Sequence, residues 1–259
     1  NIISVGVNAV SQLEAIEKFQ KIEDLEKTIC LIPEDRFRDE IEKGLSSTNI
    51  KLKKKYFYES DPTLLTKRIE KITKYDRRKQ NLADEIKRVE ESDEFNKEKI
   101  IENLEKKDTL GKVNFDSVII SAFDETLKSI TTSLIYTDVT PKKTYFITLN
   151  QWFDESLLNE DSSQNLYFPS VNKKNFDEFK QEYFKKYSSE PNQISLLGFD
   201  MVGLIFYLSK VNNFQLNNKI FDQKNTFKGK IGLFEIEDKR IKHVLNFYKV
   251  ENNKFKKIF

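Results

Sequence analysis

Short apolar runs alternate along the chain with longer segments in which apolar residues recur every three or four positions. The apolar runs predict strands over residues 2–5, 28–32, 51–58, 117–121 and 144–149. The intervening segments predict helices near residues 10–21, 35–44, 62–87, 94–107 and 124–135. Strands and helices that alternate in this way are typical of α/β folds built on a parallel sheet.

The pattern changes after Pro169. One predicted helix carries aromatic residues at helical spacing, namely Phe176, Phe179, Tyr183, Phe184 and Tyr187. The next, over residues 194–208, is apolar on all sides, which predicts burial on most of its surface. In residues 229–259, apolar and polar residues alternate in stretches separated by turn-like breaks. This pattern predicts two or three antiparallel strands.

Residues 76–108 are charged nearly throughout and contain few apolar positions. They predict two helices that either lie on the surface or project from it as a hairpin. A coiled-coil surface for a partner is the sharper alternative, although few apolar positions follow a heptad.

Composition narrows the function classes. The 259 residues include 44 Lys and Arg against 42 Asp and Glu, so net charge gives no reason to expect nucleic-acid binding. The single cysteine, Cys30, lies in an apolar run and is expected in the core, and one Cys with one His excludes a His/Cys metal site. No apolar run approaches about 20 residues, so no transmembrane segment is expected.

Enzyme signatures are weak. The chain contains no nucleophile elbow, no phosphate-binding loop and no dinucleotide fingerprint, and it has only seven glycines. Exposed carboxylates are so abundant that no pair stands out, and His243 is better explained as a surface or packing residue than as a base. We therefore expect a binding protein without catalytic activity, cofactor or metal.

Ligands of open parallel sheets bind at the carboxyl ends of the strands. At residues 121 and 122 a serine and an alanine allow the chain to turn from strand to helix, and Asp124 can cap that helix. Phe123 and Trp152 follow strand ends and either face a cleft or belong to the core or a lid; the sequence leaves both interpretations open.

Three segments carry a resemblance to a known family: "TICLIPEDRFRDEIEKGL", "NFDSVIISAFDETLKSITTSL" and "FDEFKQEYFKKYSSEPNQISLLGFDMVGLIFYL". Their order resembles the type I periplasmic-binding-protein fold, which includes branched-chain amino-acid receptors of ABC transporters. The chain is most similar to penicillin-binding-protein activators of alphaproteobacteria, on the strength of "YDRRKQNL", "FDSVI" and the pair Trp152 and Asp154.

This resemblance implies an α/β protein of two Rossmann-like lobes, with the N-terminal lobe incomplete because the chain enters the family's fold part-way. Residues 1–22 and 166–225 would belong to the N-terminal lobe. Residues 23–165 and 226–259 would form the C-terminal lobe, with residues 76–108 as a charged helical insertion.

The resemblance also implies ligand-binding positions in a cleft. By position, Ser4 matches a carboxylate-binding serine, Val7 and Asn8 replace a small-residue and threonine turn, and Phe37 replaces a tyrosine. The acid that binds the ligand's ammonium falls near Asn150. A neutral amide cannot replace the charge-assisted hydrogen bond of a carboxylate, so ordinary amino-acid binding is not expected.

The function implied by the resemblance is that of a non-enzymatic cell-envelope binding protein, located in the periplasm, that regulates peptidoglycan synthesis by contacting a penicillin-binding protein. Residues 76–108 are the candidate contact. The alternative is a solute receptor that delivers an amino-acid-like ligand to an ABC transporter. Whether a missing N-terminus carries a lipid anchor is left open.

Overall fold

A seven-stranded sheet forms the centre of the computed structural model, which describes residues 6–213, 225–230, 232–237 and 240–259. The strand order is β10-β9-β5-β4-β3-β1-β2. The strands are β1 (Thr28–Pro33), β2 (Leu52–Tyr58), β3 (Ser117–Ile120), β4 (Tyr145–Thr148), β5 (Leu166–Ser170), β9 (Asn246–Glu251) and β10 (Lys254–Lys257). The expected strand at residues 2–5 lies outside the described residues.

Strands β1 to β5 pair in parallel, whereas β9 pairs antiparallel with both β5 and β10. All six residues of β1 and all four of β3 are buried, as expected for strands covered on both faces. Cys30 lies in this core, as the sequence predicts. The α/β class is confirmed, and the apolar runs at residues 28–32, 51–58, 117–121 and 144–149 form β1, β2, β3 and β4.

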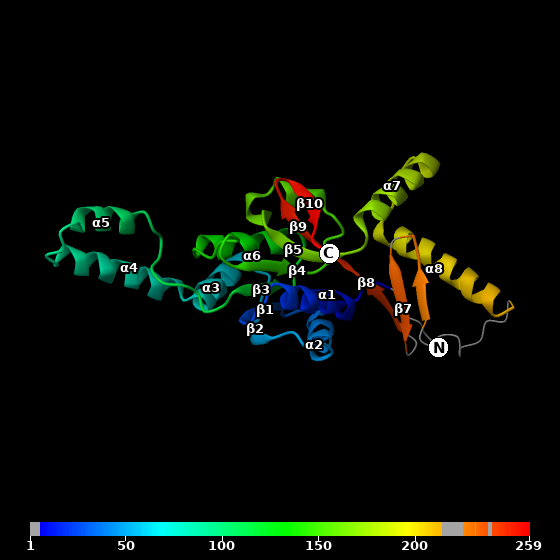
Figure 1. The fold of residues 1–259 in the computed structure, drawn as a ribbon, viewed down its shortest axis with the longest axis horizontal. Helices are drawn as coiled ribbons and strands as arrows, with labels where there is room; N and C mark the ends of the chain where they lie inside the picture. Colours follow the sequence, from blue (N-terminus) through cyan, green and yellow to red (C-terminus); the bar gives the residue numbers. More distant parts are fainter. Residues whose placement is uncertain (1–5, 214–224, 231, 238–239) are drawn as a thin grey trace.

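Helices cover both faces of the sheet (Figure 1). On one face α1 (Ala9–Ile22) packs against α2 (Arg38–Ser46), and on the other α3 (Pro62–Thr73) packs against α6 (Asp124–Tyr136). Gly44 permits the close approach of α1 and α2, since a Cβ atom there would lie 2.7 Å from a Leu13 methyl group. Two short 3-10 helices follow β4, η1 (Glu155–Asn159) and η2 (Asp161–Ser163).

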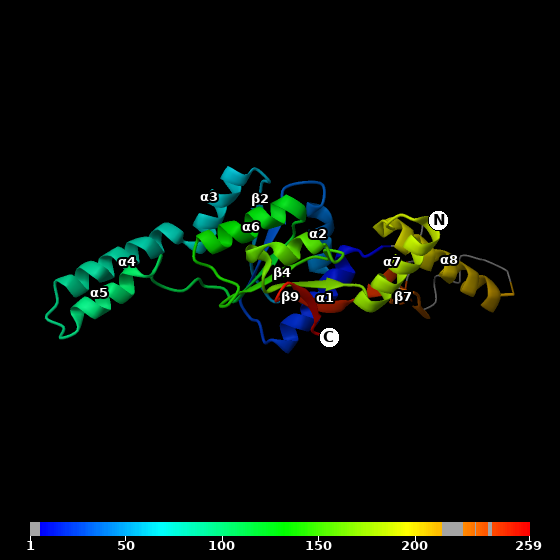
Figure 2. The ribbon, with the colours of Figure 1, turned by 90° about the horizontal axis from the view of Figure 1, so that it is seen from above.

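The charged segment forms a helical hairpin of α4 (Tyr75–Glu90) and α5 (Lys97–Glu105). It projects from the sheet, on the side opposite to α7 and α8 (Figures 1 and 2). Residues 62–87 were expected to form one helix, but Lys74 adopts a left-handed conformation with φ 54° and separates α3 from α4. The hairpin has a small core of its own, formed by Leu82, Val89 and Leu104 with partly buried neighbours.

A buried arginine fixes the base of the hairpin. The side chain of Arg78 donates to the Thr73 carbonyl (3.1 Å), to the Thr109 hydroxyl (3.1 Å) and to the Thr137 carbonyl. Thr109 in turn donates to the Asp138 carboxylate at 2.6 Å. This network joins the end of α3, the chain returning from α5 and the end of α6, and so holds the hairpin against the body.

The second part of the chain contains α7 (Lys173–Tyr187), α8 (Gln193–Val211) and a three-stranded antiparallel sheet. The strands of that sheet are β6 (Asn225–Lys228), β7 (Leu233–Glu237) and β8 (Arg240–Val244). In residues 229–259 the sequence predicts two or three strands, and the structure has four, β7 to β10. His243 of β8 is buried beside the Phe234 ring, which agrees with a packing role.

One face of α8 is buried through Leu196, Asp200, Leu204 and Leu208, while its opposite face exposes residues such as Val202. The prediction that this helix is buried on most sides is therefore wrong for the described residues, because no element among them covers the outer face. With 19 residues, α8 is also long and apolar enough to cross a membrane by length and composition, so the expectation that no segment has those properties is corrected. Helices that pack on a sheet can pass the same test, which makes this weak evidence for a membrane span.

The expected lobe boundaries stay a prediction, and the described elements are divided between the two sheets as follows. Helix α1 packs against β5 and β9 of the large sheet and against β8 of the small one, residues 166–170 form β5, and β6, β7 and β8 form the separate three-stranded sheet. The chain passes between the two regions at residues 171–172 and at Leu245. These crossings follow the ends of β5 and β8, which the sequence pattern does not mark.

We predict that Arg78→Ala lowers the free energy of unfolding by about 2–4 kcal/mol, because it removes three buried hydrogen bonds and leaves their acceptors without a donor. Arg77→Ala is the matched control, since Arg77 is the exposed neighbour, and it should change stability by less than about 0.5 kcal/mol. Urea unfolding measures both variants. Equal effects would show that Arg78 does not anchor the hairpin.

Candidate functional site

A cleft of about 530 Å³ opens at the carboxyl ends of β1, β2 and β3. Parallel strands leave the sheet at this edge, so the loops that follow them converge there. The lining comes from the ends of four strands, β1 to β4, from α2 and from the first turns of α1 and α6. Its residues are Val7, Ala9, Gln12, Pro33, Asp35, Phe37, Glu40, Ile41, Tyr58, Ser60, Ser121, Ala122, Phe123, Asp124, Thr126 and Leu149.

Hydrogen bonds hold the floor of the cleft. Tyr58, the last residue of β2, donates its hydroxyl to the Ser121 carbonyl at 2.8 Å and so links the ends of β2 and β3 across β1. Burial, together with the nearby Asp35 carboxylate, raises the pKa of Tyr58, which keeps the hydroxyl protonated as a donor. The buried Ser121 hydroxyl has no hydrogen-bond partner among the described residues except the neighbouring thiol of Cys30.

Two helices begin at the cleft without a side-chain cap. Helix α2 follows Phe37 and helix α6 follows Phe123, and neither phenylalanine can accept a hydrogen bond from the free N–H groups of the first turn. The two rings are 42% and 41% exposed, so they supply apolar surface at the rim. Asp35 accepts from the N–H of Phe37 at 2.8 Å and fixes the turn into α2.

The charge of the lining is one-sided. Asp35, Glu40 and Asp124 contribute carboxylates, and no Lys or Arg is among the lining residues of the part of the chain that the structure describes. Glu40 also accepts from the N–H of Ala9 at 3.3 Å. A free carboxylate would therefore meet like charges, offset only by the two helix N-termini, whereas a neutral or cationic group would meet favourable partners.

The sequence-predicted positions divide into three groups. Phe37 and Phe123 lie together at the cleft. Ser4 lies outside the described residues, and Asn8 caps α1 by accepting from the N–H of Ser11 at 2.8 Å, beside the cleft rather than in its lining. Trp152 is not in the lining either; it packs against the core with a positive φ of 50°.

Asn150 is 2% exposed and does not line the cleft. Its side-chain oxygen accepts from the N–H of Trp152 and from the hydroxyl of Ser170, both at 2.8 Å, and its backbone N–H donates to Gln12 at 2.7 Å. In this structure its side chain shapes the turn after β4 and is not presented to a ligand in the cleft.

Sequence reasoning overlooked Gln12, Glu40 and Tyr58. Tyr58 ends a predicted strand, so the rule that ligands bind at strand ends could have found it. Gln12 and Glu40 lie inside helices, and no local pattern distinguishes them from other polar helical residues. Only the packing of α1 and α2 beside the strand ends brings them to the cleft.

Neither the single cysteine nor the single histidine supplies a reactive group to the cleft. Burial raises the pKa of the Cys30 thiol to about 12, which keeps the sulfur protonated and unreactive. His243 lies in the three-stranded sheet, where burial lowers its pKa to about 4, so it is not placed as a base for the cleft. Among the described residues, no group of three or more His, Cys, Asp or Glu side chains could hold a metal ion.

No family model and no curated protein sequence matches the chain. Solved structures do match. An extracellular ligand-binding receptor from Desulfohalobium retbaense has a TM-score of 0.59 at 13% identity, over 98% of this chain and 40% of that one. A branched-chain amino acid ABC transporter periplasmic ligand-binding protein from Burkholderia xenovorans has a TM-score of 0.61 at 7% identity, over 98% of this chain and 64% of that one.

The C-domain of LpoA from Haemophilus influenzae, described as a regulator of PBP1A, has a TM-score of 0.52 at 10% identity, over 100% of this chain and 71% of that one. The chain has the type I periplasmic-binding-protein fold. This confirms the resemblance at the level of the fold, shared by receptors and by LpoA. The chain spans 40–64% of the length of the first three matching structures.

We predict that Asn150→Asp destabilises the protein by about 2 kcal/mol at pH 7.5, because the new carboxyl is buried without a cation. Burial raises its folded-state pKa, so the loss is small near pH 4 and grows as the pH rises. Asn8→Asp is the control, because aspartate caps a helix as well as asparagine does. Thermal unfolding between pH 4 and 7.5 tests this, and a loss that does not depend on pH would contradict burial of the new charge.

Proposed function

We propose that the chain belongs to a non-enzymatic cell-envelope protein of the periplasm that regulates peptidoglycan synthesis by contacting a penicillin-binding protein. The observation that carries this proposal is the α4–α5 hairpin. It has its own apolar core, is anchored by Arg78 and projects from the body, away from the cleft. Such an arm serves contact with another macromolecule better than closure over a small ligand.

Two further observations support the proposal. The described lining of the cleft contains carboxylates but no cation, so it offers no oppositely charged side chain to the carboxylate of an amino acid. In addition, the LpoA C-domain, a regulator of PBP1A, shares the fold along the whole of this chain. At 10% identity, this similarity concerns the fold alone.

We also propose that the two sheets are parts of two lobes. The seven-stranded sheet with α1 to α6 would be one lobe, and the three-stranded sheet with α7 and α8 would belong to the other. The short crossings at residues 171–172 and at Leu245 support this division, because only a few residues join the two regions there.

A solute receptor is the second candidate, favoured by the cleft itself. Its volume of about 530 Å³ lies within the range of small-molecule sites, and two uncapped helix N-termini and apolar rings face it. The one-sided charge of the lining then favours a neutral or cationic solute over a free carboxylate.

We predict that the purified chain raises the rate of glycan polymerisation or cross-linking by a bifunctional penicillin-binding protein severalfold. A version in which residues 76–108 are replaced by a short glycine-serine loop should lose this effect, while Phe123→Ala, which changes the cleft, should retain it. No stimulation by the intact chain would contradict the proposed function.

Thermal unfolding with a panel of amino acids, polyamines and sugars separates the second candidate. We expect shifts below about 1 °C. A ligand at a hundred times its dissociation constant adds about 2.7 kcal/mol, which would raise the melting temperature by several degrees in a receptor. Such a shift, abolished by Phe123→Ala, would favour the solute receptor.

A further inference from the structure

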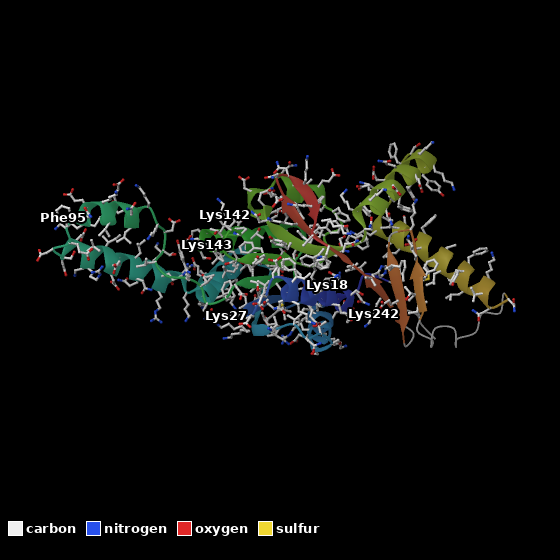
Figure 3. The ribbon with its side chains drawn as sticks, viewed as in Figure 1. Lys18, Lys27, Phe95, Lys142, Lys143 and Lys242 are labelled. Atoms are coloured by element: carbon white, nitrogen blue, oxygen red, sulfur yellow. The ribbon has the colours of Figure 1, made fainter. Side chains whose placement is uncertain are left out.

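The tip of the hairpin combines a concentrated negative charge with one fully exposed aromatic ring. Residues 91–96 join α4 to α5. Together with Glu90, the last residue of α4, they contain four carboxylates, from Glu90, Glu91, Asp93 and Glu94, and no Lys or Arg. Phe95 is 100% exposed, against 52% for Phe184 on α7. Figure 3 places Phe95 at the end of the hairpin that is farthest from the sheet.

Nothing on the hairpin uses the Phe95 ring. The small core beneath it consists of Leu82, Val89 and Leu104, with Ile86, Ile100, Ile101 and Leu110 packed around them. Phe95 is not in that cluster, and no ring or cation contact involves it among the described residues. Burial of a ring of this size against apolar surface is favourable, and the contacts within the hairpin do not bury it.

The tip is held in a defined orientation. Arg88 pairs with Glu85 at 2.8 Å and with Glu94 at 3.3 Å, which ties the turn back to α4. Arg78 fixes the opposite end of the hairpin to the body. Glu90 and Asp93 form no ion pair within the described part of the chain, so their charges are available outward. An arm ordered in advance loses little conformational entropy on binding.

We propose that the hairpin tip is a docking element: Phe95 inserts into an apolar pocket of a partner protein, and the surrounding carboxylates meet Lys and Arg side chains at the rim of that pocket. This inference rests on the proposed function, in which the partner is a penicillin-binding protein. Charge complementarity favours a basic protein surface as the partner, because the carboxylates of the tip repel nucleic acid and anionic lipid.

The two parts of the tip have separate kinetic signatures. Long-range attraction between the carboxylates and a basic rim speeds association and weakens with salt, whereas the buried ring slows dissociation. Phe95→Ala should therefore raise the dissociation rate about 30-fold. Glu90→Lys combined with Asp93→Lys should lower the association rate about tenfold at low salt and remove most of its salt dependence.

The test measures the rates of association and dissociation between the chain and the purified extracytoplasmic regions of penicillin-binding proteins from the same organism. One of the two partners is immobilised on a sensor surface. Phe184→Ala is the control for the ring, since Phe184 is an exposed phenylalanine on α7. Glu105→Lys with Asp108→Lys is the control for charge, since it makes the same change at exposed positions near the base of the hairpin. Urea unfolding of each variant verifies that it folds as stably as the unaltered chain.

Loss of affinity confined to the tip variants would support the docking element. Binding that the tip variants share equally with the controls would overturn this inference and leave the proposed function standing. Absence of binding by the unaltered chain to every penicillin-binding protein tested would overturn the proposed function, and the docking element with it.

Discussion

Parallel pairing around β1 is the constraint on which the rest of the structure depends. This strand lies between β2 and β3 in register, with Pro33 opposite Tyr58 and Leu31 opposite Ile120. All three strands therefore end at the same edge of the sheet, and the segments that follow them must share the space beyond it. The cleft is a result of this register, and its floor is closed by the hydrogen bond from Tyr58 to Ser121.

The same frame supports the hairpin. Helix α6 begins beside the cleft at Phe123, and the Thr137 carbonyl at its other end accepts from Arg78. The 13 residues of α6 span about 20 Å, so the cleft and the base of the hairpin are features of one packed body separated by one helix. A small acidic cleft and a helical arm with an acidic tip are thus built on a single scaffold.

The local sequence pattern predicted an element correctly where a single interaction determines that element. The continuous apolar runs of β1 and β3 reflect burial on both faces, and Asp61 with Pro62 marks the start of α3 by capping chemistry. The pattern did not reveal the break at Lys74, because lysine rarely adopts the left-handed conformation that it has here. It also did not reveal β5, since a proline such as Pro169 argues against a strand. On the β4 side the pairing stops at residue 167, and Pro169 lies opposite Phe247 of β9.

The residues of the candidate site were likewise predicted only in part from the sequence. Phe123 could be predicted at the cleft because it follows a strand end, and Phe37 through the family resemblance. Asn150 also follows a strand end, but its side chain bonds Ser170 and Trp152. By itself the sequence determined the α/β class, the strands β1 to β4 and the charged helical character of residues 76–108, since burial and charge repeat along the chain with the period of each element. Tertiary structure alone decided which polar residues meet at the cleft and which face of α8 is covered, because those contacts join residues far apart in sequence and leave no local pattern.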